Sequence, residues 1–275
     1  GLAGGEPDMD TPEHVKQAGA AALMAGFTKY TAASGIPELR EALSAKLKAD
    51  NNLSYDAKDI CVTGGAKMAC YMAILAMVEE GDEVIIPAPY WVSYPEMVLL
   101  AGGVPVVIET TEATGWKMTP EQFEDAMTPR TKMVIINSPG NPTGAIYTEE
   151  ELLALGEVAL SEDITILSDE IYEKLVYGDA KHVSIASLSD ELYNCTITVN
   201  GFSKGYSMTG WRLGYTAAPR ALAEAIEKIQ NHTVSNACSF AQYGALAALT
   251  GDQTFVSDMV GEYDVRRQFM LGRLR

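Results

Sequence analysis

The sequence has 275 residues, 47% of them hydrophobic, which is enough apolar material for one large domain or two modest ones. With 37 acidic and 20 basic residues its formal net charge is −17, which argues against nucleic-acid binding and against adhesion to anionic membranes. The four cysteines lack zinc-type spacing, and neither a membrane span nor a signal peptide is evident, so we expect a cytoplasmic protein with reduced thiols and no metal site.

Helices are predicted near both ends of the chain and between short apolar strands. Thr11, Pro12 and Glu13 predict a helix with Thr11 as its N-cap that reaches about residue 25, and the next helix runs over 37–48. The predicted strands are 60–62, 83–86, 104–108, 133–136, 164–167 and 196–199, and the later helices are 66–77, one from about 93, 120–127, 149–160 and two or three over 220–275. This alternation predicts an α/β fold, a mostly parallel sheet covered by helices on both faces.

The segment 200–214, NGFSKGYSMTGWRLG, follows the last predicted strand, and ligands bind beyond the carboxyl ends of the strands in such sheets. It places Lys204 among small residues, with Arg212 eight positions later. A lysine amine condenses with an aldehyde when it is unprotonated and accessible, and an arginine offers a bidentate grip on phosphate. The alternative for this segment alone is a surface loop with an incidental Lys–Arg pair.

Two more strand ends carry candidate groups. Gly65 and Ala66 lie in a glycine-rich turn, TGGAK, whose backbone N–H groups suit a phosphate, although a plain strand–helix turn explains them equally well. Asp169 ends an apolar run and needs a partner, either a protonated pyridine nitrogen or an ordinary helix cap or structural arginine. Tyr172, three residues on, either offers its hydroxyl to the same ligand or packs as an amphipathic residue.

Asn141 and Trp91 complete the set. Asn141 lies in the turn NSPGNPTG, and Trp91 follows another strand with an indole face that can stack on a planar ring; a plain reverse turn and a core tryptophan are the alternatives. A lysine, an acid for a pyridine nitrogen, phenol and amide donors, an aromatic face and a phosphate cradle are together what pyridoxal 5′-phosphate (PLP) requires. Nicotinamide cofactors, metals or a Ser-His-Asp triad would leave most of this set unexplained.

On these segments the sequence resembles the class I aminotransferases of fold type I, in particular the bacterial and archaeal aspartate aminotransferase group. The resemblance rests on residues 201–214 and on the segments 5–8, 29–31, 35–40, 88–96 and 168–172, in consistent order along the chain. It implies a PLP-dependent aminotransferase that moves an amino group from an amino acid, most readily aspartate, to a 2-oxo acid such as 2-oxoglutarate.

The resemblance also implies a role for each matching residue. Lys204 would bind the cofactor's aldehyde covalently and then shuttle a proton between the substrate's α-carbon and the cofactor's C4′ atom. Asp169 would keep the pyridine nitrogen protonated. The other cofactor contacts would be Tyr172 and Asn141 to the ring hydroxyl, Trp91 stacked on the ring, and Arg212, Gly65, Ala66 and Ser203 around the phosphate.

Substrate and partner contacts follow from the same resemblance. Gly5 would lie in the segment that closes over the substrate's carboxylate, and Lys67 would recognise a side-chain carboxylate. Tyr30 would reach the phosphate of a neighbouring subunit, which implies a homodimer with shared sites. Gly201 stands where other members have a phosphate-binding serine, so that contact is not expected here. We expect the substrate to contact Gly5, Lys67, Trp91 and Asn141.

The domain organisation is expected to follow the family. Residues 1–25 would form an N-terminal arm and helix, 26–255 the PLP-binding large domain, and 256–275 the start of a helix leading to a C-terminal small domain that is largely missing. That segment would carry the arginine that clamps the substrate's α-carboxylate, so the chain alone should bind PLP but transaminate poorly. Two alternatives stay open: a C–S lyase or an alanine or aromatic aminotransferase at the same site, and a PLP-sensing domain of a transcription regulator.

Overall fold

The computed structural model describes residues 5–274, and this part of the chain is built around one mixed, seven-stranded sheet. The strand order is β1-β7-β6-β5-β4-β2-β3. Only β7 runs against the others, because it pairs antiparallel with both β6 and β1. The strands are β1 (Ile60–Thr63), β2 (Glu83–Ala88), β3 (Val104–Glu109), β4 (Thr131–Asn137), β5 (Thr165–Asp169), β6 (Thr196–Gly201) and β7 (Gly214–Ala217).

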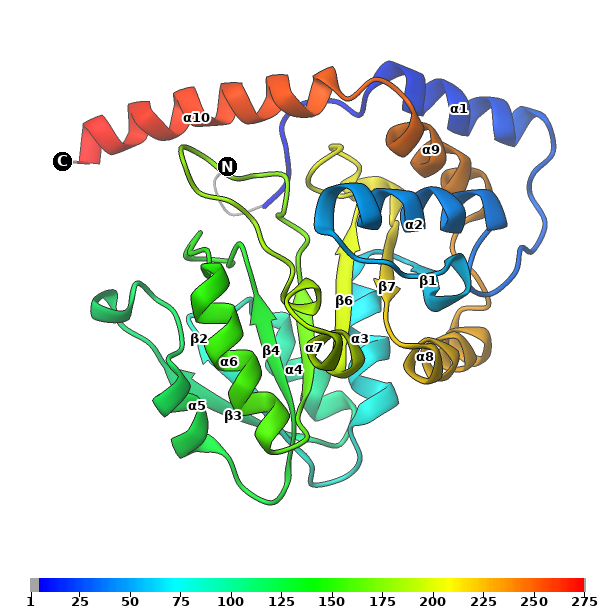
Figure 1. Cartoon of the computed structure of the whole chain (residues 1–275). Coiled ribbons are helices and arrows are strands. Elements are labelled where there is room, and N and C mark those ends of the chain that lie inside the picture. The colour runs from blue at the N-terminus through cyan, green and yellow to red at the C-terminus, as the bar shows by residue number, and fades with distance from the viewer. Residues whose placement is uncertain (1–4, 275) are drawn as a thin grey trace.

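The described residues form ten α-helices, most of which cover the two faces of the sheet and the end near β1, whereas α10 extends away from the sheet at the top of Figure 1. They are α1 (Glu13–Met24), α2 (Pro37–Asn51), α3 (Ala66–Met77), α4 (Ser93–Leu100), α5 (Pro120–Ala126), α6 (Glu149–Ser161), α7 (Asp190–Cys195), α8 (Arg220–Thr233), α9 (Ser239–Thr250) and α10 (Thr254–Leu274). None of these helices is both long and apolar enough to cross a membrane. The predicted α/β fold is confirmed, and so are its six predicted strands.

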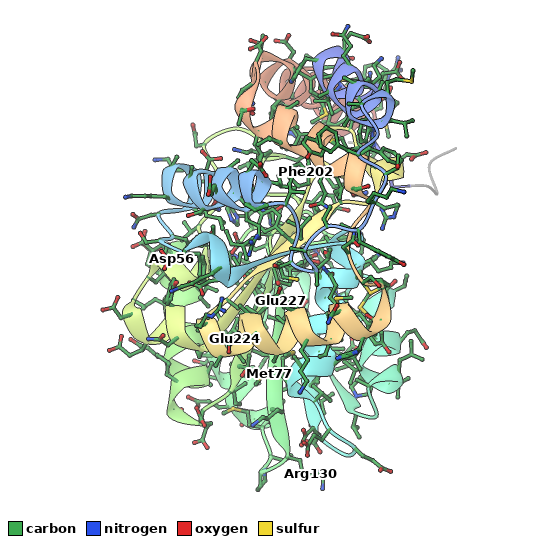
Figure 2. The ribbon with its side chains drawn as sticks, turned by 90° about the vertical axis from the view of Figure 1, so that its right-hand side faces the viewer. Asp56, Met77, Arg130, Phe202, Glu224 and Glu227 are labelled. Carbon is green, nitrogen blue, oxygen red and sulfur yellow. The ribbon has the colours of Figure 1, made fainter. Side chains whose placement is uncertain are left out.

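Side chains alternate between the two faces of the sheet, as the pleat of a strand requires. On β2, Val84 and Ile86 join the core beneath α3, α4 and α8, whereas Ile85 between them joins the core beneath α5 and α6. Both kinds of position are buried, so the strands are almost continuously apolar, which is typical of a parallel sheet covered on both sides. Figure 2 looks onto α8, whose buried Ile226 faces the sheet and whose exposed Glu224 faces outward.

The sequence did not predict β7 or α7. β7 is the four-residue segment GYTA, and α7 has six residues, so neither is long enough to show a hydrophobic period. β7 becomes a strand because β1 and β6 leave a place between them, with Thr216 opposite Cys61 on one side and Val199 on the other. Tertiary pairing, and not local propensity, therefore determines this strand.

The predicted N-cap role of Thr11 is wrong. Pro12 occupies the N-cap, without a side-chain cap hydrogen bond. The hydroxyl of Thr11 instead donates to the carbonyl of Ser207 at 2.6 Å and accepts from the indole N–H of Trp211 at 3.1 Å. The start of α1 is thus fastened to the loop that carries Lys204, a long-range contact that replaces the local cap.

Candidate active site

The carboxyl ends of the parallel strands surround a cavity of about 820 Å³, which lies within the range of roughly 300–1,000 Å³ that small-molecule sites occupy. Ten of the predicted site residues line it together: Gly5, Ala66, Lys67, Trp91, Asn141, Asp169, Tyr172, Ser203, Lys204 and Arg212. The sheet topology explains this gathering, because parallel strands end on the same edge. We refer to this space as the Lys204 cavity.

Lys204 follows β6 in a turn that the adjacent strand holds in place, since the N–H of Phe202 donates to the carbonyl of Leu213 at 3.2 Å. Its Nζ atom donates to the carbonyl of Gly5 and lies 5.7 Å from the centroid of the Tyr172 ring. Burial lowers the pKa of Lys204; the carboxylate of Glu6 opposes this shift and Arg212 adds to it. The lowered pKa favours the unprotonated amine, which is the form that attacks a carbonyl.

Arg212 and the start of α3 form a basic concavity next to Lys204. Arg212 has a left-handed backbone (φ 55°), and its guanidinium donates to the carbonyl oxygens of Thr209 at 2.8 Å and Gly64 at 3.4 Å. Gly65 must be glycine, because its φ is +99° and a Cβ there would lie 2.5 Å from Nη2 of Arg212. The N–H of Gly65 donates to the carbonyl of Thr63 at 2.8 Å, so the free donors at this helix end begin with Ala66. A guanidinium and a helix N-terminus together suit a phosphate.

Asp169 is the last residue of β5 and is 3% exposed. Its Oδ1 accepts from the N–H of Ile171 at 3.1 Å, and its Oδ2 accepts from the hydroxyl of Tyr94 at 2.7 Å and from the thiol of Cys70 at 3.6 Å. Burial raises the pKa of Asp169, and these hydrogen bonds oppose the shift. Among the described residues, no lysine, arginine or histidine forms an ion pair with Asp169, and the main causes of its pKa shift include no cation. A buried carboxylate that borders a cavity without a cationic partner suits a ligand that brings a positive charge, such as a protonated pyridine.

Asn141 and Tyr172 meet across the cavity, where the amide of Asn141 lies 3.4 Å from the hydroxyl of Tyr172. Asn137 holds this arrangement by two hydrogen bonds. Its Oδ1 accepts from the backbone N–H of Asn141 at 2.8 Å, and its Nδ2 donates to the carbonyl of Asp169 at 2.9 Å. The two predicted donors and the predicted acid therefore belong to one connected unit at the ends of β4 and β5.

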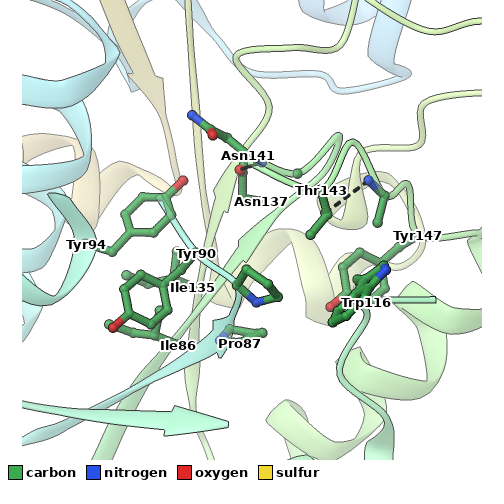
Figure 3. A pocket seen from close by; sticks show the side chains of 13 residues that line it. Ile86, Pro87, Tyr90, Tyr94, Trp116, Ile135, Asn137, Asn141, Thr143 and Tyr147 are labelled. Atoms are coloured by element: carbon green, nitrogen blue, oxygen red, sulfur yellow. Dashed lines mark hydrogen bonds between the residues drawn. The ribbon is translucent and has the colours of Figure 1, made fainter. Parts of the chain in front are cut away.

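A second, much smaller cavity of about 30 Å³ lies beside the Asn141 turn (Figure 3) and shares Tyr90, Tyr94, Asn137 and Asn141 with the lining of the Lys204 cavity. Trp116 and Tyr147 close it, and the hydroxyl of Tyr147 accepts from the N–H of Met118 at 2.9 Å. Within the turn, the N–H of Ala145 donates to the hydroxyl of Thr143 at 3.2 Å. This cavity has room for about one or two water molecules, so we assign no second ligand to it.

Trp91 and Lys67 stand together at the mouth of the Lys204 cavity. The Nζ atom of Lys67 lies 4.9 Å from the centroid of the Trp91 ring, within the range of a cation–π contact. Trp91 in turn meets the ring of Tyr94 edge to face, with centroids 5.3 Å apart and planes at 86°. A cation and an aromatic ring in contact with each other thus form part of the cavity lining.

Two predicted residues do not line the Lys204 cavity: Gly65, whose N–H is already bonded to Thr63, and Tyr30. The side chain of Tyr30 is 88% exposed and borders a separate cavity of about 370 Å³ beside Phe27 and Tyr243. The sequence also gave no role to Tyr94, Glu6 or Thr209, which do line the Lys204 cavity. Tyr94 lies in the segment 88–96 and three residues after Trp91, but nothing in that spacing reveals that its hydroxyl reaches β5.

Comparison with known proteins agrees with this geometry. The family described as aminotransferase class I and II matches residues 1–275. The aspartate aminotransferase of Geobacillus stearothermophilus is 52% identical over 100% of this chain and 70% of its own length. The aspartate/prephenate aminotransferase of Cereibacter sphaeroides is 50% identical over 100% of this chain and 69% of its own length.

Solved structures with this fold belong to the same family. An aspartate aminotransferase of Thermus thermophilus superposes with a TM-score of 0.95 at 44% identity, covering 98% of this chain and 71% of that one. An aromatic aminotransferase of Pyrococcus horikoshii gives a TM-score of 0.96 at 43% identity, covering 99% and 74%. With the matched family and the Lys204 cavity, these similarities establish that the chain belongs to the class I and II aminotransferases, which are PLP-dependent enzymes.

Proposed function

We propose that the chain is the cofactor-binding part of an aminotransferase that takes its amino group from aspartate and passes it to a 2-oxo acid, 2-oxoglutarate being the expected acceptor. The observation that carries this proposal is the Lys204 cavity, which joins a lysine of lowered pKa, a buried carboxylate and a basic concavity, with Lys67 at its mouth. The relatives' own activities, aspartate and aspartate/prephenate transamination, support it.

The cavity residues fit PLP group by group. Asp169 would face the ring nitrogen, Arg212 with Ser203 and the amide of Ala66 would hold the phosphate, and the remaining ring contacts would be Trp91, Asn141 and Tyr172. When bound, PLP supplies an aldehyde for the amino group and a ring that withdraws electrons from the substrate's α-carbon. The chain supplies the charges and donors that hold such a ring in one orientation.

Lys204 would carry the proton. Its Nζ atom, whose pKa burial lowers, would be the base in the cavity that removes the proton from the substrate's α-carbon and returns it. Gly5 would close over the substrate's carboxylate, since its carbonyl already reaches Nζ of Lys204. The excess of negative charge, −17 overall, makes a local cation necessary for any dicarboxylate substrate.

Lys67 is the residue on which the substrate proposal depends. Its ammonium group lies at the mouth of the Lys204 cavity and over Trp91, where a substrate's second carboxylate would enter. The test measures how fast aspartate and alanine each change the visible absorption of bound PLP, in the unaltered chain and in Lys67→Ala. We expect Lys67→Ala to reduce the preference for aspartate by about tenfold or more, the loss of one charge-assisted contact. An unchanged preference would remove Lys67 from substrate recognition.

A second candidate is an aromatic amino donor at the same site. It is favoured by the aromatic ring of Trp91 in the lining of the cavity, by Val92, which lines it and is 75% exposed, and by the similarity to an aromatic aminotransferase structure. The same absorption assay with phenylalanine decides between the two. A faster reaction with phenylalanine than with aspartate would make the aromatic donor the preferred substrate.

The proposal also includes a cytoplasmic homodimer in which Tyr30 reaches the neighbour's phosphate site. The 88% exposure of Tyr30, outside the chain's own Lys204 cavity, supports this arrangement. We further propose that residues 1–25 form the arm, 26–255 the PLP-binding domain and 256–275 the start of a connecting helix. Residues 1–4 lie outside the described part of the chain. Sedimentation of the chain at several concentrations, with Tyr30→Ala compared for PLP affinity, tests the dimer.

A further inference from the structure

The carboxylate of Asp169 is held from the interior of the protein by Tyr94, a residue of the first turn of α4. Tyr94 is 2% exposed, and its hydroxyl donates to Oδ2 of Asp169 at 2.7 Å. The N–H of Ile171 occupies Oδ1 at 3.1 Å, and the thiol of Cys70 lies 3.6 Å from Oδ2. Donors from α3, α4 and the turn after β5 thus fix the plane of this carboxylate.

The ring of Tyr94 has a separate contact. It meets the indole of Trp91 edge to face at 5.3 Å, and its backbone N–H donates to the carbonyl of Trp91 at 3.1 Å. Figure 3 shows Tyr94 and Tyr147 on opposite sides of the small cavity. One residue therefore touches both the acid and the aromatic face that the cofactor site needs.

The electrostatics of the pair favour donation from tyrosine to carboxylate. Burial raises the pKa of Tyr94, and the negative charge of Asp169 raises it further, so the phenol keeps its proton. In return, burial raises the pKa of Asp169 and the bond from Tyr94 lowers it. The other titratable groups that act on one or both of these side chains are Cys70, Glu170 and Tyr172.

We propose that Tyr94 is a positioning residue of the PLP site: its hydroxyl orients the Asp169 carboxylate toward the ring nitrogen of bound PLP, and its ring supports Trp91. Without this donor, the buried carboxylate competes with the ring nitrogen for the shared proton, because nothing else in its immediate surroundings stabilises its charge as well. The proposal rests on the assignment of Asp169 to the ring nitrogen.

The first test measures the affinity of the cofactor-free chain for PLP, with the visible absorption of bound PLP as the signal. Tyr94→Phe keeps the ring and removes one oxygen, and we expect it to bind PLP about tenfold more weakly, the order expected for a lost hydrogen bond to a charged group. Tyr147→Phe is the matched control, because it also removes a buried tyrosine hydroxyl that has one partner, the N–H of Met118. Equal affinities of Tyr94→Phe and Tyr147→Phe would overturn the proposal.

The second test asks whether Tyr94 acts through Asp169. In an Asp169→Asn background the further change Tyr94→Phe should alter PLP affinity by less than about twofold, since the charge that the hydroxyl stabilises is gone. A tenfold loss in both backgrounds would show that the hydroxyl does not act through the carboxylate. If Asp169→Asn itself left PLP binding unchanged, the assignment of Asp169 would fail, and that outcome is distinct from a failure of Tyr94 alone.

A spectroscopic readout separates positioning from a purely structural role. The visible absorption of bound PLP would change with pH as the Lys204 nitrogen that holds it titrates, and a positive charge on the ring nitrogen would lower that pKa by repulsion. Tyr94→Phe should therefore raise the pH midpoint of this change. Incorporation of 3-fluorotyrosine at position 94, which is a stronger donor of nearly the same shape, should not raise it. Equal midpoints in the unaltered chain, in Tyr94→Phe and in the 3-fluorotyrosine protein would contradict the proposal. This readout reports only on folded protein with bound PLP, so it does not depend on how much of Tyr94→Phe folds.

Discussion

Asp169 and Glu170 are adjacent, buried carboxylates at the end of β5, and their surroundings differ completely. Glu170, 1% exposed, accepts from Ser184 at 2.6 Å, from Ser168 at 3.0 Å and from His182 at 3.0 Å. Asp169 has a phenol, a thiol and one backbone N–H, and it borders the Lys204 cavity. The carboxylate of Glu170 has its hydrogen-bond partners within the protein. The negative charge of Asp169 has no cationic partner in the described part of the chain and suits a cationic ligand.

The polar cluster around Glu170 is connected to α2 by further hydrogen bonds and an ion pair. Lys46 pairs with Glu173, and the amide of Asn51 donates to Glu173 at 2.8 Å and to Ser184 at 2.9 Å. Burial raises the pKa of Glu173, but Lys46, Asn51 and Lys174 together outweigh it and the net shift is downward. The cluster joins α2 to the loop after β5, so we interpret it as structural. Glu170 therefore has a structural role because protein groups stabilise its charge, whereas Asp169 is available to a cationic ligand.

The largest expected effect comes from Glu170→Ala. The change leaves His182 and the Ser184 hydroxyl buried without their acceptor, and breaking such a buried pair costs about 3–5 kcal/mol in the free energy of unfolding. Urea denaturation of the cofactor-free chain measures this, with Glu170→Gln as the isosteric control that should cost less. PLP affinity in the surviving folded fraction should change little; a loss like that of Asp169→Asn would erase the distinction between the two carboxylates.

Asp169→Asn should produce the opposite pattern. The reaction of bound PLP with amino acid should slow by about 100-fold, which corresponds to about 2.7 kcal/mol, because the amide cannot stabilise a positive charge on the ring nitrogen. The free energy of unfolding of the cofactor-free chain should stay the same or increase, since a buried charge without a cationic partner is removed. Stopped-flow absorption and urea denaturation measure the two quantities. A slow reaction together with a large loss of stability would mean that Asp169 is also structural.

Ser184→Ala removes only one hydrogen bond of the cluster around Glu170, so its expected effect on stability is smaller. It removes the 2.6 Å hydrogen bond to Glu170, and we expect a loss of about 1.5–2 kcal/mol in the free energy of unfolding, as for a bond to a charged acceptor. The rate of the reaction with amino acid should be unchanged, because Ser184 does not line the Lys204 cavity. Ser187→Ala is a suitable control, since that hydroxyl donates only to the carbonyl of Ser184 and touches no carboxylate.

The smallest expected effect is a pH dependence of stability from His182. Burial lowers the pKa of this imidazole, but the carboxylates of Glu170 and Glu173 together outweigh it, so the net shift is upward. A raised folded-state pKa stabilises the fold below the unfolded value of about 6.5, and this contribution is lost as pH rises through the folded value. The free energy of unfolding should therefore decline as pH rises above about 6.5, and His182→Gln should flatten that slope. An identical slope in the variant would assign the pH dependence to another group.

The sequence predicted the acid of this comparison but not its surroundings. Asp169, Lys204 and Asn141 could be found because each follows a strand that is apolar enough to recognise, and the carboxyl ends of parallel strands meet. The bonds from Tyr94 to Asp169 and from Thr11 to Ser207 span 75 and 196 residues, and no local pattern encodes which side chains meet across such separations. β7 was missed for the same reason, since its four residues become a strand only between β1 and β6.

The central claim is that the Lys204 cavity binds PLP through Lys204, and chemical trapping tests it most directly. The chain is incubated with PLP, reduced with borohydride, digested and mapped by mass spectrometry. We expect a phosphopyridoxyl group on the peptide that contains Lys204, no such group in Lys204→Ala, and loss of the visible absorption of bound PLP in that variant. Labelling of Lys67 or of surface lysines instead, with the absorption unchanged in Lys204→Ala, would contradict the account.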